Sequence, residues 1–107
     1  MELKERLHAY EKIIIHFGSK EQMEVAIEEM AELTKEIIKY FRSFQKGKCY
    51  DFLDLYQEIA DVSVMIEQLN YLFNCKDKVD EIKADKIKRT LAKIEEERRL
   101  NNGEHQN

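Results

Sequence analysis

Apolar side chains recur every three or four residues along most of the chain, which is the spacing of one face of an α-helix. The first such stripe covers residues 3–17, and Gly18 behind it suits the left-handed stop of a helix. A second stripe runs from Ser19 to about residue 44, where Ser19 and Gln22 have the spacing of a capping box. The first half of the chain therefore predicts two consecutive helices.

Two more helices follow a basic, aromatic loop. The third starts near Asp51 or Asp54, either of which can cap it, and continues to about Phe73. For the fourth helix Asp77 is the expected cap, and the apolar pattern fades after Glu95. Short connections between amphipathic helices are typical of a largely antiparallel bundle, so we predict an all-α four-helix bundle.

The domain organisation follows from where this pattern stops. Residues 1–97 contain no internal repeat and no break in composition, and we expect them to form a single helical domain. Residues 98–107 are polar and offer no stripe to bury, so we predict a flexible C-terminal tail there.

The composition of the chain argues against two classes of protein. The chain has 107 residues, of which 43% are hydrophobic, and 18 basic against 22 acidic side chains give a net charge of −4. This is too apolar for a disordered chain and too acidic for a general nucleic-acid binder. A domain this small buries only part of its surface, so we expect it to self-associate. Part of the third helix, namely Tyr56, Val64 and Tyr71, lies off its main stripe and is the expected interface.

The expected location is cytoplasmic. Cys49 and Cys75 form no CxxC motif and no disulfide framework, and residues 1–6 lack the layout of a signal peptide. The longest aliphatic run is the triplet at residues 13–15, far short of the roughly 20 residues that span a bilayer. We expect no membrane partner and no nucleic-acid partner.

Four carboxylates stand where a purely solvated helix face would not place them. Glu29 and Glu32 occupy neighbouring turns of the second helix, with Glu29 at the edge of the apolar stripe. On the third helix Glu58 falls inside the stripe and Asp61 lies just beyond it, with no Lys or Arg nearby. Buried carboxylates must be protonated or neutralised by cations.

A divalent cation held by these four residues resolves the conflict. Oxygen-only ligands favour Mg²⁺, or Mn²⁺, over zinc. The competing interpretation is that each pair belongs to an ordinary solvated face, because i, i+3 acidic pairs arise freely in a chain with 37% charged residues.

The order of these motifs resembles a known family. The runs Glu28-Glu29-Met30-Ala31-Glu32 and Glu58-Ile59-Ala60-Asp61 are similar to the EExxE and ExxD motifs of MazG-like nucleoside triphosphate pyrophosphohydrolases, an all-α superfamily. The likeness extends back to residues 18–22 and forward to residues 86–91, where Thr90 replaces the second Arg of a basic segment. It covers roughly residues 16–95.

This resemblance implies an enzyme that cleaves (d)NTPs between the α- and β-phosphates, releasing (d)NMP and pyrophosphate, in house-cleaning or control of the nucleotide pool. It implies metal binding and catalysis by Glu29, Glu32, Glu58 and Asp61, and self-association as a dimer or tetramer. Glu28 is an orienting residue or a surface Glu, and we favour the surface role. The implied substrate contacts come from Lys86, Arg89, Phe17 and Gln22.

Simpler roles compete for several of these residues. Lys86 and Arg89 suit the triphosphate, but they equally suit the basic flank of an amphipathic helix. Phe17 could stack on a base, although core packing is the role we favour.

Two other classes of protein compete with the enzyme. A non-enzymatic helical adaptor or regulator fits the same composition, and it would show no response to Mg²⁺. A di-iron carboxylate bundle requires Glu-x-x-His twice, and only Glu5 and His8 have that spacing.

Overall fold

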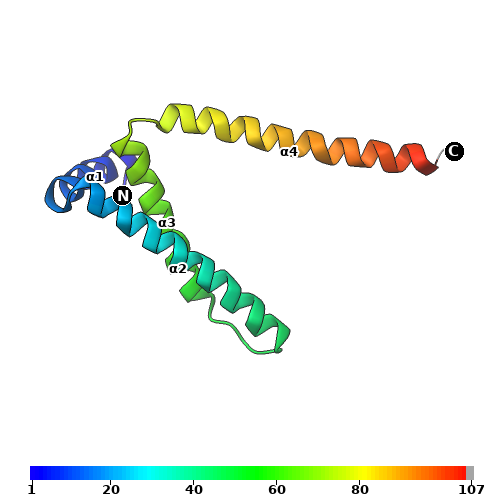
Figure 1. Ribbon diagram of the computed structural model, residues 1–107, viewed down its shortest axis with the longest axis horizontal. Coiled ribbons are helices and arrows are strands. Elements are labelled where there is room, and N and C mark those ends of the chain that lie inside the picture. The colour runs from blue at the N-terminus through cyan, green and yellow to red at the C-terminus, as the bar shows by residue number, and fades with distance from the viewer. Residues whose placement is uncertain (106–107) are drawn as a thin grey trace. The chain divides into compact units, whose positions relative to one another are not determined.

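A computed structural model describes residues 1–105, and all regular structure in that range is helical (Figure 1). The helices are α1 (Leu3–Phe17), α2 (Ser19–Gln45), α3 (Phe52–Leu72) and α4 (Lys76–His105). The predicted all-α class with four helices is confirmed for the described residues. The chain divides into two compact units, one comprising Met1–Asn74 and the other starting at Cys75.

One glycine both ends α1 and starts α2. Gly18 has a φ of +96°, and its N–H donates to the carbonyl of Ile14 at 2.8 Å. Its own carbonyl accepts the N–H of Gln22 at 3.1 Å, so Gly18 is the N-cap of α2. The predicted capping box is therefore wrong, because Ser19 is already helical and no side chain caps this end. The turn at Gly18 is so tight that no residue is left over for a side-chain cap.

The connection between α2 and α3 is held at both ends. Of the two predicted candidates, Asp51 is the residue that caps α3, by accepting the N–H of Leu53 at 3.0 Å. The rings of Tyr40, Tyr50 and Phe52 form a cluster, in which the centroid of Tyr50 lies 5.3 Å from that of Tyr40 and 5.2 Å from that of Phe52. The Tyr50 hydroxyl also donates a hydrogen bond to Glu36 on α2. These contacts tie the connection to both helices.

In the first unit α2 and α3 lie side by side and antiparallel, and α1 packs against both (Figure 1). Arg6 on α1 contacts the Glu67 carboxylate on α3 at 2.9 Å, and the Tyr10 hydroxyl donates to the same carboxylate at 3.1 Å. The core is thin. The buried apolar residues of the described chain are Tyr10, Ala26, Val62 and Met65.

The second unit is built on the single helix α4. Asp77 lies in its first turn rather than capping it, because the helix already begins at Lys76, and the carbonyl of Cys75 accepts the N–H of Val79 at 2.9 Å. The helix continues through residues 98–105, where the sequence predicts a tail. Residues 106 and 107 of that predicted tail lie outside the described residues.

Local forces explain the extra turns of α4. Glu, Arg and Leu are good helix formers, and the pairs Glu95–Arg98 and Glu96–Arg99 bridge neighbouring turns at 3.3 and 2.7 Å. None of the helices, over the residues that the structure describes, is both long and apolar enough to cross a bilayer.

Candidate metal centre

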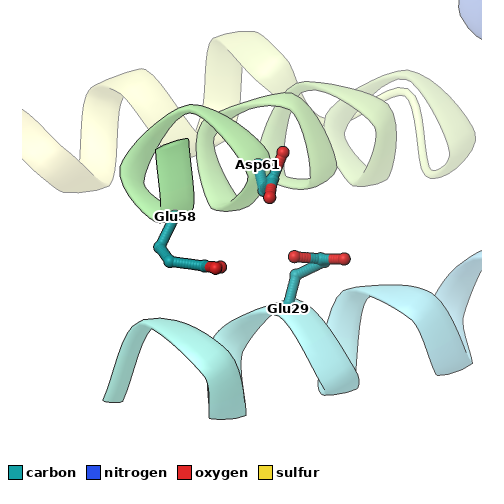
Figure 2. Close-up of side chains that lie close together, drawn as sticks. All are labelled: Glu29, Glu58 and Asp61. Atoms are coloured by element: carbon teal, nitrogen blue, oxygen red, sulfur yellow. The ribbon is translucent and has the colours of Figure 1, made fainter. Parts of the chain in front are cut away.

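Three of the four predicted carboxylates converge between α2 and α3. Glu29 comes from α2, and Glu58 and Asp61 come from neighbouring turns of α3 (Figure 2). One carboxylate oxygen of each lies within 4.8 Å of the other two. The three side chains meet because α2 and α3 pack antiparallel, so that the edge of the apolar stripe of α2 lies against the edge of the apolar stripe of α3.

Glu58 carries the strongest signal at this site. Its side chain is half-buried, and the buried Val62 and Met65 lie one and two turns further along the same face. Within the described chain its Oε2 atom is buried without a hydrogen-bond partner, and none of the ion pairs reaches it. A buried carboxylate oxygen without a donor is costly, so a cation between the three side chains fits this geometry.

The raised pKa values of Glu29 and Glu58 also favour a bound cation. Burial raises the pKa of Glu29, and the nearby charges of Asp61 and Glu58, together with a hydrogen bond to Asp61, raise it further. Burial is also the largest cause of the raised pKa of Glu58, followed by the negative charges of Asp61 and Glu32. Glu29 and Glu58 therefore resist ionisation while their neighbours stay charged, and a divalent cation would relieve this repulsion.

Glu32 and Glu28 differ from the converging three. Glu32 is exposed and lies outside the group, although its charge raises the pKa of both Glu29 and Glu58. Glu28 is exposed as well, which agrees with the surface role that the sequence favours.

The sequence analysis missed Glu36. This residue is half-buried, accepts the hydrogen bond from Tyr50, and contributes to the raised pKa of Glu58. It follows Glu29 by seven residues, which is the spacing of two helical turns. The seven-residue spacing could have revealed Glu36, because it places Glu36 on the same face of the second helix as Glu29, beyond the acidic motif at residues 28–32.

The predicted substrate contacts come from three helices, α1, α2 and α4. Phe17 is 51% exposed and meets His16 edge to face, so the favoured core role is wrong; it is the last residue of α1, where the chain turns away at Gly18. Gln22 is buried in α2. Lys86 and Arg89 are exposed on α4, and their phosphate contacts stay a prediction.

The donor set is chemically consistent with a hard divalent cation. Its three members offer only carboxylate oxygens, the ligands that Mg²⁺ and Mn²⁺ prefer. Glu5 and His8, the spacing that would favour a di-iron site, are exposed on α1 and lie outside this group.

Comparisons with protein-family models, with curated proteins and with solved structures give no match for this chain. The resemblance of its acidic motifs to those of MazG-like enzymes therefore rests on the residues themselves.

Proposed function

We propose that this protein is a metal-dependent nucleoside triphosphate pyrophosphohydrolase of the MazG-like type, which converts (d)NTPs to (d)NMPs and pyrophosphate and acts as a homo-oligomer. The observation that carries the proposal is the buried, unpartnered Oε2 of Glu58, which lies beside two further carboxylates. A helical protein built only for packing would gain stability by placing an apolar side chain there.

Each acidic residue has a distinct part in this proposal. Glu29, Glu58 and Asp61 hold Mg²⁺ or Mn²⁺, and the exposed Glu32 joins them from the next turn of α2. When bound, the cation neutralises phosphate charge and lowers the pKa of a coordinated water. In the net reaction one water is consumed and the bond between the α- and β-phosphates is broken.

Two basic residues of α4 are the candidate triphosphate contacts in this proposal. Lys86 and Arg89 are exposed, are three residues apart and lie on neighbouring turns of one helix. Guanidinium and ammonium groups at this spacing suit the oxygens of a triphosphate.

The deciding experiment is a panel of canonical and modified (d)NTPs incubated with the protein and Mg²⁺, with pyrophosphate and orthophosphate quantified separately. We expect pyrophosphate and a nucleoside monophosphate in equal amounts, and complete loss of turnover in EDTA. The variant Glu58→Gln should be inactive, whereas Glu11→Gln, an exposed carboxylate on α1, should retain full activity.

Two results would reject the proposal in different ways. Orthophosphate and a nucleoside diphosphate as products would replace this reaction by another while keeping the metal site. A protein that shows neither turnover nor any response to Mg²⁺ would be a non-enzymatic helical protein.

A further inference from the structure

Among the described side chains, two buried oxygen atoms have no hydrogen-bond partner, and both belong to α3. One is the Oε2 atom of Glu58, which the candidate metal centre accounts for. The other is the Oε1 atom of Gln68, a residue that is only 3% exposed. A buried amide oxygen without a donor is destabilising, so Gln68 is as costly to the fold as Glu58 and points to a missing partner of its own.

A second buried glutamine lies on α2. Gln22 is 9% exposed, so two of the six buried residues among the described side chains are glutamines. A core this thin would gain stability from apolar side chains at both positions. Gln22 is one of the substrate contacts that the family resemblance implies, whereas no motif includes Gln68.

Both glutamines are displaced from the acidic group by the same interval. Gln22 precedes Glu29 by seven residues, and Gln68 follows Asp61 by seven residues. Seven residues are almost two turns, so each glutamine shares a helix face with its carboxylate and stands ~10 Å from it along the axis. Because α2 and α3 run antiparallel, the two displacements have the same direction, and both glutamines come to the same level of the helix pair (Figure 1).

This separation suits the two ends of a nucleotide. The phosphates of a nucleoside triphosphate bind the cation, and the base lies at a comparable distance beyond the sugar. The edge of a base offers N–H donors beside acceptor atoms, and the planar amide of a glutamine matches such a pair. An N–H donor is the partner that the Oε1 atom of Gln68 lacks.

Movement of α1 would give a base access to Gln68. Gln68 directly follows Glu67, the α3 residue that Arg6 and Tyr10 of α1 contact, so α1 packs over this end of the helix pair. Gly18 alone joins α1 to α2, and no heavy atom lies within 4 Å of the position that a Cβ atom would take there. A change in the backbone angles of this one residue therefore moves α1 away from α3.

We propose that Gln68, together with Gln22, binds the base of the nucleotide whose phosphates bind at the acidic group, and that the Oε1 atom of Gln68 accepts an N–H of that base. The inference rests on the proposed function for the place of the phosphates, and it adds a residue that selects the substrate through its base. A glutamine that only fixed the packing of the helices would not affect the choice of base.

Calorimetric titration with α,β-imido nucleoside triphosphates, which resist hydrolysis, tests the base contact; inorganic tripolyphosphate is the ligand without a base. In excess Mg²⁺ we expect the wild type to bind at least one of the common nucleotides about tenfold or more tightly than tripolyphosphate. Gln68→Met keeps the side-chain volume but removes the amide, so it should bind that nucleotide about tenfold more weakly and tripolyphosphate equally well. The matched control is Gln57→Met, at an exposed glutamine of α3, which should bind both ligands as the wild type does.

Methylation of the base tests the same contact in the unaltered protein. An analogue of the tightest-binding nucleotide in which methyl groups replace the N–H hydrogens of the base edge should bind no better than tripolyphosphate. Equal nucleotide affinity in the wild type and Gln68→Met, or undiminished binding of the methylated analogue, would overturn the base contact and leave metal-dependent phosphate binding intact. If neither nucleotides nor tripolyphosphate bind in Mg²⁺, the proposed function fails at the metal site, and this inference fails with it.

Discussion

The hydroxyl of Tyr50 donates a hydrogen bond to the carboxylate of Glu36, and this contact joins the α2–α3 connection to the helix that carries Glu29. Tyr50 thereby neighbours the acidic site, since the charge of Glu36 also raises the pKa of Glu58. The Tyr50–Glu36 hydrogen bond therefore connects the segment between α2 and α3 with the carboxylates of the candidate metal centre.

Replacing Tyr50 with Phe should lower the Tm by about 4 °C at pH 7, because it removes a charge-assisted hydrogen bond while keeping the ring. The matched control is Tyr40→Phe, a hydroxyl removed from the same ring cluster. Burial and Glu36 raise the pKa of Tyr50, so its contribution is complete below the usual value of 10.0 and is lost as the pH rises through the folded value. The difference in Tm between wild type and Tyr50→Phe should therefore stay constant from pH 7 to 10 and shrink only as the pH rises above 10. Equal Tm losses in Tyr50→Phe and Tyr40→Phe would contradict the assigned role.

The variant Glu58→Gln should leave the metal-free protein unchanged or make it more stable, because it removes a charge that is partly buried and repelled by its neighbours. It should also abolish the stabilisation that Mg²⁺ produces in the wild type. Thermal melts of both proteins in EDTA and in excess Mg²⁺ measure this. A variant that melts lower in EDTA yet still responds to Mg²⁺ would show that Glu58 is not a ligand.

The acidic site should also destabilise the metal-free protein as the pH rises. The pKa values of Glu29 and Glu58 are raised by burial and by mutual repulsion, so the folded protein binds protons more tightly than the unfolded chain. Their contribution to stability is complete below the unfolded value of 4.5 and is lost as the pH rises through the folded values.

The difference in Tm between Glu58→Gln and the wild type, measured in EDTA, should accordingly grow from pH 4 to pH 7. Glu11→Gln, an exposed carboxylate on α1, serves as the reference for ordinary surface titration. A difference that stays constant across this range would mean that Glu58 is ionised equally in both states.

Tyr10 should have the largest effect on the stability of the first unit. It is 3% exposed, and its hydroxyl donates to Glu67 across the α1–α3 contact. Tyr10→Phe should cost about 1 kcal/mol and Tyr10→Ala about 3–5 kcal/mol in urea unfolding, because only the second removes the ring from the core. Similar losses for both variants would place the stabilisation in the hydrogen bond rather than in packing.

The helices themselves could be predicted because their signals are local. A stripe at intervals of three and four residues, a glycine at position 18 and an aspartate at position 51 act over a few residues, and all three appear in the structure where expected. The unusual place of Glu58 was equally visible, since it depends only on the direction of one side chain relative to its own stripe.

The packing of α3 on α2 determined which of the predicted carboxylates meet at the candidate site. Helical spacing places Glu29 and Glu32 on neighbouring turns, but only the position of α3 determines that Glu29 meets Asp61 and Glu58 while Glu32 stays exposed. The place of Glu36 beside the site also depends on packing, because its hydrogen-bond donor, Tyr50, lies fourteen residues further along the chain. Sequence periodicity specifies the directions of side chains around one axis, whereas a site between helices depends on the distance and register of two axes, which long-range packing alone determines.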